Sequence, residues 1–201
     1  MATNKAYTVK FRRKRQNKTN YKARLRLLVS RKNRLVIRKS INKVYLQLVK
    51  YNTKGDEVLI NIDSGKLKKY GWKYKLNNIP ACYLTGLLFG LEAKKHKYDH
   101  AILDLGLNVS VKGASLYTAF KGIIDSGLNV PYDKTILPSE DRVKGKHIAD
   151  YALLLKKNPE IYKKQFSAYL SKNIMPEDIV KNFEEVKNKI IGSYSKWKKK
   201  S

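Results

Sequence analysis

The chain begins with basic side chains that no acidic side chain neutralises. Its first carboxylate belongs to Asp56, and 18 Lys and Arg residues precede it. The densest stretch, from Lys10 to Lys18, reads KFRRKRQNK. Nucleic acids carry closely spaced phosphates, and neutralising them releases condensed counterions, which favours binding. These residue types therefore predict an N-terminal arm that lies along phosphates, although a solvated tail or a localisation signal has a similar composition.

More basic residues follow the arm. Lys22 and Arg26 are four positions apart and would share one face of a helix, with Arg24 displaced from it. Basic residues around the first predicted hairpin either blunt an exposed sheet edge or form a platform for RNA, and both roles can hold together. In the arm and these segments, the residues predicted to contact RNA are Arg12, Arg13, Lys14, Arg15, Lys18, Tyr21, Lys22, Arg24, Arg26, Arg31, Lys32, Arg34, Arg38 and Lys43.

A second basic segment, within residues 63–78, interleaves lysines with aromatic rings. Aromatic rings can stack on unpaired bases while lysines hold the backbone, and each stacked base contributes ~1–3 kcal/mol. Alternatively, the rings plug the loop onto the core. The residues predicted to contact RNA here are Lys66, Lys68, Lys69, Tyr70, Trp72 and Lys73. Arg142, in a predicted turn after Pro138, is added to them, although it could pair with a neighbouring acid instead.

Catalytic interpretations have weaker support. Asp63, Asp104 and Asp125 admit a two-metal nuclease, but no motif fixes their geometry. Asp104 could instead cap a neighbouring helix. His96 and His100 have the spacing of metal ligands on a helix, yet the predicted helix ends between them. We therefore expect no catalytic residue, no metal and no cofactor. A general nucleic-acid binder of the chromatin type and a metal-dependent nuclease remain as alternatives.

Composition limits the class of protein. The chain has 201 residues, a net charge of +28 and 42% hydrophobic residues, which suffices for a folded core with extensions. A single cysteine, Cys82, excludes an internal disulfide. No run of 18 apolar residues predicts a membrane span, and no apolar segment follows the N-terminal charges as in a secretory signal. We therefore expect a cytoplasmic protein without membrane contact.

The elements that must position the basic residues begin near Thr19. Residues 1–19 are predicted to be extended and disordered in the free protein. Thr19 or Asn20 can cap a short helix that ends near Val29. Strands are predicted at residues 34–38, 43–49 and 57–62. Turn-like residues separate them, so they should form an antiparallel meander.

A helix is predicted to start at Pro80, because proline suits the first turn. Residues 101–105 are a short apolar run, which predicts a buried strand at the centre of the sheet. A second helix should span residues 115–126, where Gly127 ends it and Pro131 prevents its continuation. The predicted fold is thus α/β, with a β-β-β-α-β-α core and a mixed sheet covered by helices.

The C-terminal part is predicted to be helical. One helix should span residues 145–157, and Asn158-Pro159 and Met175-Pro176 each open another. The last helix should bury its apolar stripe, which consists of Ile179, Phe183, Val186 and Ile190. We expect three parts: a basic arm with a short helix at 1–33, an α/β RNA-binding core at 34–130, and a helical extension with a basic tail at 131–201.

Five stretches, in order, carry a resemblance to a known family. They are Arg12-Arg13-Lys14-Arg15 with Lys18-Thr19 and Arg24-Leu25; Lys69-Tyr70-Gly71-Trp72-Lys73; Pro80-Ala81-Cys82-Tyr83-Leu84-Thr85-Gly86-Leu87-Leu88; Asp125-Ser126-Gly127-Leu128-Asn129-Val130-Pro131; and Pro138-Ser139-Glu140-Asp141-Arg142 with Gly145-Lys146-His147-Ile148. The chain resembles the ribosomal protein L-eighteen family, which binds 5S ribosomal RNA in the large subunit. The block at Lys69–Lys73 and the helical extension resemble the archaeal and eukaryotic type.

The resemblance implies a structural constituent of the large ribosomal subunit. It implies that the protein binds 5S rRNA and helps to attach it to the large-subunit rRNA in the central protuberance. Its neighbour there is another 5S-binding ribosomal protein. No homo-oligomer is expected. Cys82 stands where the family often has alanine, which is a mild difference.

Overall fold

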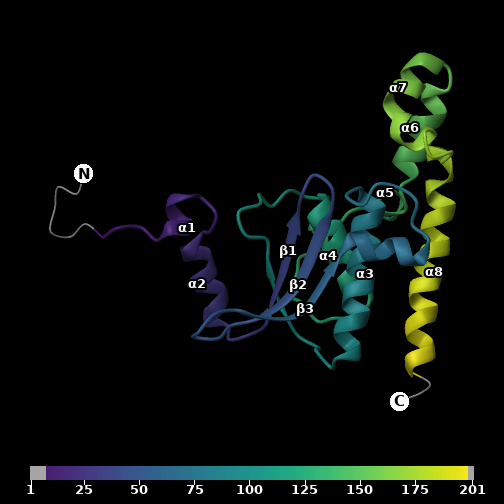
Figure 1. The fold of residues 1–201 in the computed structure, drawn as a ribbon. Helices are drawn as coiled ribbons and strands as arrows, with labels where there is room; N and C mark the ends of the chain where they lie inside the picture. Colours follow the sequence, from purple (N-terminus) through teal and green to yellow (C-terminus); the bar gives the residue numbers. More distant parts are fainter. Residues whose placement is uncertain (1–7, 199–201) are drawn as a thin grey trace.

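The sheet has four strands of mixed direction. The structure is a computed structural model that describes residues 8–198, with side chains up to residue 195 (Figure 1). β1 (Arg34–Lys39), β2 (Val44–Lys50) and β3 (Glu57–Asp63) form the predicted antiparallel meander. β4 (Ile102–Asp104) pairs with β1 in parallel, so the order is β3-β2-β1-β4. The predicted mixed sheet is confirmed.

The predicted central position of β4 is wrong, because this strand lies at an edge of the sheet. It pairs only with β1, from Arg34 opposite Ile102 to Val36 opposite Asp104. Ile102 and Leu103 are only half-buried. A short apolar run indicates that the faces of a strand are covered, but it carries no information on how many of its edges are paired. The number of paired edges depends on where the chain re-enters the sheet after β3.

Helices α3 (Ile79–Lys95) and α4 (Ser115–Asp125) pack together over one face of the sheet. Their backbones approach closely, since a Cβ on Gly86 would lie 1.9 Å from the carbonyl oxygen of Ala119. Both helices begin within a residue of the predicted position. The strand residues buried in the same core cluster are Leu35, Ile37, Val44, Leu46, Leu48, Ile60 and Ile62.

The other face of the sheet is polar. Side chains alternate between the faces of a strand, so Arg34 and Arg38 point away from the face that α3 and α4 cover. Tyr45 lies opposite Arg38 on β2 and is 39% exposed. Asp104, at the end of β4, lies opposite Val36 and therefore on this polar face as well. The charged groups of β1 and β4 thus meet on the face without α3.

Two short helices form the described part of the arm. α1 (Arg12–Arg15) is helical where an extended chain was predicted, and α2 (Tyr21–Val29) is the predicted short helix. The Asn20 side chain caps α2 by accepting a hydrogen bond from the Ala23 amide at 3.1 Å. Neither helix has a buried residue. Figure 1 shows both helices on one side of the sheet, with α3 and α8 on the other.

Two segments predicted to be irregular contain helical turns. The basic loop after β3 forms a 3-10 helix, η1 (Ser64–Tyr70), which Asp63 caps by accepting a hydrogen bond from the Gly65 amide. The turn after Pro138 is the one-turn helix α5 (Glu140–Lys144). It ends at Gly145, whose φ of +87° favours glycine. Such short helices lack the apolar periodicity by which longer helices are recognised in a sequence.

The C-terminal helices are confirmed, with shifted ends. α6 (Lys146–Leu155) and α7 (Pro159–Leu170) pack against each other at the end of the molecule that lies at the top of Figure 1. A 3-10 turn, η3 (Pro176–Asp178), leads into the long α8 (Ile179–Lys198). Another short 3-10 turn, η2 (Lys134–Ile136), precedes α5.

α8 docks on α3, and the predicted stripe of Ile179, Phe183, Val186 and Ile190 is buried. These four residues belong to the same hydrophobic cluster as the sheet and α3. A small second cluster joins α6 to α7 through Ala152, Leu155 and Phe166. The division of the chain after residue 130 stays a prediction.

Candidate nucleic-acid interface

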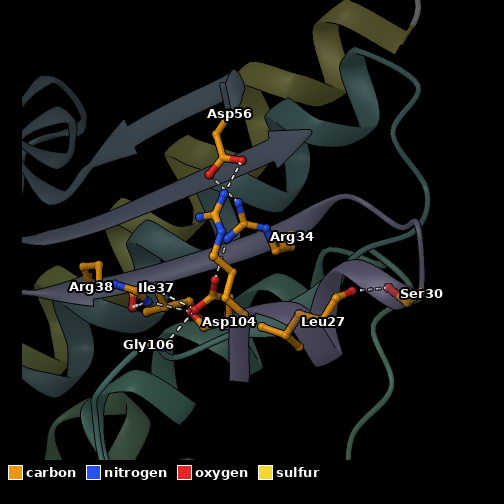
Figure 2. A network of polar contacts seen from close by, with 9 residues as sticks. Leu27, Ser30, Arg34, Ile37, Arg38, Asp56, Asp104 and Gly106 are labelled. Atoms are coloured by element: carbon orange, nitrogen blue, oxygen red, sulfur yellow. Dashed lines mark hydrogen bonds and ion pairs between the residues drawn. The ribbon is translucent and has the colours of Figure 1, made fainter. Parts of the chain in front are cut away.

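Five charged side chains alternate in sign on the polar face of the sheet; we call Arg24, Asp56, Arg34, Asp104 and Arg38 the ion-pair chain. Asp56 accepts from Arg24 at 2.8 Å and from Arg34 at 2.6 Å. Asp104 accepts from Arg34 at 2.8 Å and from Arg38 at 2.9 Å. In Figure 2 the Arg34 guanidinium lies between Asp56 and Asp104. The ion-pair chain therefore ties α2 to β1, β4 and the turn before β3.

The centre of the ion-pair chain is buried and its ends are open. The side chains of Arg34 and Asp104 are 4% and 8% exposed, whereas those of Arg24 and Arg38 are 30% and 40% exposed. Burial raises the pKa of Asp104, but hydrogen bonds and charges from Arg38 and Arg34 outweigh burial and hold that pKa below its usual value. The pKa of Asp56 is lowered in the same way by Arg24 and Arg34. Both carboxylates are therefore ionised at neutral pH.

The predicted RNA contact of Arg34 is corrected by this geometry. Its guanidinium is committed to two carboxylates and is inaccessible to a phosphate. The buried Nε atom has no hydrogen-bond partner within the described chain, so Arg34 is held by its two terminal nitrogens alone. Its role is to position its neighbours. Asp104, expected as a possible helix cap, instead joins two arginines.

A cleft of about 880 Å³ lies between the arm and the loop after β4. We call it the arm cleft. The ion-pair chain contributes all five of its members to the lining. The other lining residues are Arg13, Lys18, Thr19, Asn20, Tyr21, Ala23, Arg26, Leu27, Leu105, Gly106, Leu107 and Asn108.

The predicted arm residues are exposed, and two of them, Arg13 and Lys18, line the cleft. Arg12, Arg13, Lys14 and Arg15 lie on α1, and Lys18 follows it. Arg13 also donates through Nε to the Thr19 hydroxyl at 2.8 Å. Lys22 and Arg26 on α2, and Arg31 and Lys32 after it, are exposed and make no ion pair within the described chain. The structure thus brings most of the predicted N-terminal residues onto the same side of the sheet.

Two basic residues of the first hairpin contact side chains of neighbouring elements. The Lys43 ammonium pairs with Asp63 at 3.3 Å, and the Lys39 ammonium donates to the Ser115 hydroxyl at 3.1 Å. These lysines therefore link the ends of strands to neighbouring elements, while keeping partial exposure. They lie away from the arm cleft, since neither lines it.

The aromatic part of the basic loop is packed inward, which corrects the prediction of base stacking. Trp72 is 3% exposed and donates through Nε1 to the Lys75 carbonyl at 3.2 Å. Tyr74 is 6% exposed and donates to the Met175 carbonyl at 2.7 Å. Tyr70 is half-buried against the core. The loop therefore uses its rings to dock onto the C-terminal part of the chain, as the alternative interpretation proposed.

The lysines of this loop remain exposed. They are Lys66, Lys68, Lys69 and Lys73. Arg142 on α5 is also exposed; its neighbour Asp141 lies 3.6 Å from the ammonium of Lys146. None of these residues lines the arm cleft.

The side chains considered for a nuclease are each engaged elsewhere. Asp63 caps η1, Asp104 binds two arginines, and Asp125 accepts a hydrogen bond from the Tyr83 hydroxyl at 2.8 Å. His96 follows α3 and lies 3.3 Å from a Glu92 carboxylate oxygen. Within residues 8–198, no three such side chains are grouped as ligands for a metal ion.

Sequence reasoning missed Asp56 and the loop Leu105–Asn108 as parts of the site. Asp56 carries a signal in the sequence, since it is the first acidic residue after 18 basic ones. The loop carries none, because its apolar and amide side chains become part of a site only where the arm lies against them. In the described part of the chain, no helix has the length and apolarity to span a membrane.

The fold is an α/β sheet, and arginine and lysine side chains line its polar face and the arm beside it. This arrangement defines a class of basic proteins suited to contact a polyanion. Residues 5–99 match the family described as ribosomal large subunit proteins 60S L5 and 50S L18. The matched residues make the chain similar to this family of large-subunit ribosomal proteins. Proteins of this family are constituents of the large ribosomal subunit, which implies the cytoplasmic ribosome as the location, with ribosomal RNA and ribosomal proteins as partners.

Proposed function

We propose that the protein binds 5S ribosomal RNA and attaches it to the large-subunit RNA in the central protuberance, beside another 5S-binding ribosomal protein. The acid-free basic arm is the observation that carries this proposal. All charges of residues 1–55 are positive, while the first carboxylate, Asp56, is bound by Arg24 and Arg34. Such a surface gains free energy by displacing counterions from a phosphate backbone.

The arm and α2 supply the main contacts to phosphates. Arg12, Arg13, Lys14, Arg15 and Lys18 position the protein on the RNA and carry little information about base sequence. Tyr21, Lys22, Arg24 and Arg26 extend this surface along α2. Arg31, Lys32, Arg38 and Lys43 continue it over the first hairpin, and Lys66, Lys68, Lys69, Lys73 and Arg142 offer a second contact surface. Tyr70, which is half-buried against the core, lies beside these lysines in the sequence.

The protein acts as a structural constituent without catalytic residues. The arm and its short helix (1–33) bind RNA, and the α/β core (34–130) positions them. The extension (131–201) faces large-subunit RNA and neighbouring proteins. Binding of RNA immobilises the exposed lysine and arginine side chains of the arm, at an entropic cost that the phosphate contacts offset.

The test is a comparison of affinities for 5S rRNA, an unrelated structured RNA of equal length and duplex DNA, between about 50 and 200 mM salt. Affinity for all three should fall steeply, by roughly 10³–10⁵ for six to ten phosphate contacts. A preference for 5S rRNA that survives at the highest salt supports the proposal. Convergence of the three affinities would instead favour a general nucleic-acid binder.

A double variant tests the contribution of the arm. Arg12→Ala with Arg13→Ala should weaken binding to every RNA and flatten the salt dependence by about one unit per lost phosphate contact. The matched control is Lys163→Ala with Lys164→Ala, which removes the same charge from exposed positions on α7. Equal effects of the two double variants would show that the arm contributes only net charge.

A further inference from the structure

The segment that follows η1, from Lys73 to Lys75, has no regular secondary structure, and helices of the C-terminal extension hold its backbone. The Lys73 amide donates to the Oδ1 atom of Asn182, in α8, at 3.5 Å. The Lys75 amide donates to the Tyr169 hydroxyl, in α7, at 3.4 Å. Neither amide makes another hydrogen bond within the described chain. Asn182 also donates to the Gly71 carbonyl at 3.2 Å, so the extension holds the segment at both ends.

Side chains along this segment alternate between the core and the solvent. Trp72 and Tyr74 are 3% and 6% exposed. Lys73 and Lys75, which follow each of these rings, are exposed. The Tyr74 ring lies 5.4 Å from the ring of Tyr169, which keeps it turned toward the extension. Because consecutive side chains face opposite ways here, the two inward rings direct both ammonium groups outward.

The helix α8 also brings a cation to the start of the segment. A Cβ built on Gly71 would lie 3.4 Å from the Lys189 ammonium. The φ of +93° at Gly71 favours glycine as well, since it ends η1 in the left-handed region. Lys73, Lys75 and Lys189 make no ion pair within the described chain. The extension therefore fixes the segment and adds a positive charge beside it.

We propose that Asn182 and Tyr169 are positioning residues for RNA binding, which hold Lys73 and Lys75 on the outside of the loop without touching RNA themselves. A lysine whose backbone is already fixed loses less conformational entropy on binding a phosphate than a lysine in a mobile segment. Lys75 thereby joins the phosphate-binding residues, because it faces outward as Lys73 does. This role rests on the proposed function, since the loop must meet RNA for its position to matter.

Hydrogen exchange of single amides tests the positioning without RNA. Asn182→Ala removes the acceptor of the Lys73 amide and should speed its exchange by about three- to tenfold. Tyr169→Phe keeps the aromatic ring but removes the acceptor of the Lys75 amide, which should exchange faster by a similar factor of about three to ten. Unchanged exchange of both amides would overturn the proposal.

Two control variants change the same residue types on the same helices. Asn188→Ala lies at an exposed position of α8 and makes no hydrogen bond within the described chain. Tyr162→Phe, in α7, loses a hydrogen bond to Glu177 rather than one to the loop. Both controls should leave the exchange of the loop amides unchanged. Equal acceleration in the controls would show that the extension acts only through overall stability, and would overturn the proposal.

The salt dependence of RNA binding tests the effect on the lysines. A variant that only loses stability keeps every phosphate contact in its folded molecules, so its salt slope stays the same. Asn182→Ala with Tyr169→Phe should instead weaken binding of 5S rRNA by about two- to threefold and lower the slope by up to about one unit. In a protein that already carries Lys73→Ala and Lys75→Ala, the same pair should have no further effect. A further loss in that background would overturn the proposal.

The natural sequence keeps this role distinct from the proposed function. Its preference for 5S rRNA over an unrelated structured RNA does not depend on these variants. Faster amide exchange with an unchanged salt slope would overturn the positioning role and leave the proposed function intact. Absence of a 5S preference in the natural sequence would instead overturn the proposed function, whatever the variants show.

Discussion

The Arg34 guanidinium donates to the Asp104 carboxylate at 2.8 Å, across 70 positions of sequence. Both side chains are buried, and this contact joins the first strand of the sheet to the last. Asp104 also accepts from Arg38 and from the Gly106 amide. One carboxylate therefore fixes the edge of the sheet and a wall of the arm cleft together.

Replacing Asp104 should destabilise the fold. Asp104→Ala leaves the buried Arg34 charge with Asp56 alone, and breaking a buried pair costs about 3–5 kcal/mol. We expect a loss near the lower end, about 3 kcal/mol, because Asp56 still holds Arg34. The free energy of unfolding from urea titration measures this loss. Glu57→Gln is the control, since Glu57 is exposed and makes no ion pair within the described chain; a similar loss in both variants would contradict the prediction.

Replacing Asp56 should weaken RNA binding, although the loss of a negative charge by itself would strengthen it. Asp56→Asn raises the net charge from +28 to +29, and charge alone would tighten binding to RNA. Because Asp56 anchors Arg24 in the arm cleft, we expect weaker binding of 5S rRNA, by about threefold at constant salt. Glu57→Gln adds the same charge one position away and should tighten this binding. Matching behaviour of the two variants would show that Arg24 needs no anchor.

The acid stability of the protein should depend on the same carboxylates. The pKa values of Asp56 and Asp104 are lowered in the folded protein, against the effect of burial, by their arginine partners. Their stabilisation is therefore complete above the unfolded pKa of about 3.9 and is lost as pH falls through the lower folded values. Urea titrations between about pH 5 and about pH 3 should show a smaller loss of stability on acidification in Asp56→Asn than in the natural sequence. Parallel curves for the two proteins would contradict this assignment.

Two glycine-to-alanine substitutions should change the stability of the protein in opposite directions. Gly86→Ala places a Cβ 1.9 Å from the Ala119 carbonyl oxygen, a backbone atom that cannot yield without separating α3 from α4. We expect a loss of about 2–3 kcal/mol or more. Gly192→Ala, in α8, meets no atom within 4 Å and should stabilise the protein by about 0.5–1 kcal/mol. Thermal unfolding of both variants provides the test, and a neutral Gly86→Ala would argue against the close helix contact.

Trp72 should prove structural. Trp72→Ala removes a ring that is 3% exposed, so we expect a loss of about 3–5 kcal/mol. Trp72→Phe keeps an aromatic ring but loses the hydrogen bond to Lys75, and should cost about 1–2 kcal/mol. The preference of Trp72→Phe for 5S rRNA over duplex should equal that of the natural sequence. A lost preference in this stable variant would restore the stacking interpretation.

The larger elements could be predicted because each carries a local signal. The apolar stripe of α8, the proline at the start of α3 and the alternation in β1 to β3 all follow from burying one face of a regular element. The short helices α1 and α5 and the turn η1 were missed. Each is about one or two turns long, so neighbouring contacts rather than periodicity decide its conformation.

The basic loop shows why composition alone could not place Trp72. Lysines interleaved with aromatic rings are compatible with stacking on bases and with packing on the core. The choice depends on whether apolar surface from elsewhere in the chain is available to cover the rings. Tyr169 supplies such surface, with its ring 5.4 Å from that of Tyr74. That surface lies about a hundred positions away in the sequence, so only the folded chain reveals it.

By itself, the sequence determined that the protein is basic, that its N-terminal arm carries no neutralising acid, and that a mixed α/β core stands behind this arm. These properties depend on residue type and local spacing. Only the tertiary structure decided which charges are free to meet RNA. Arg34 and Arg38 are four positions apart on one strand, yet the first is buried between Asp56 and Asp104 while the second opens into the arm cleft. A buried charge requires a partner of opposite sign, and the fold brings that partner from a distant part of the chain.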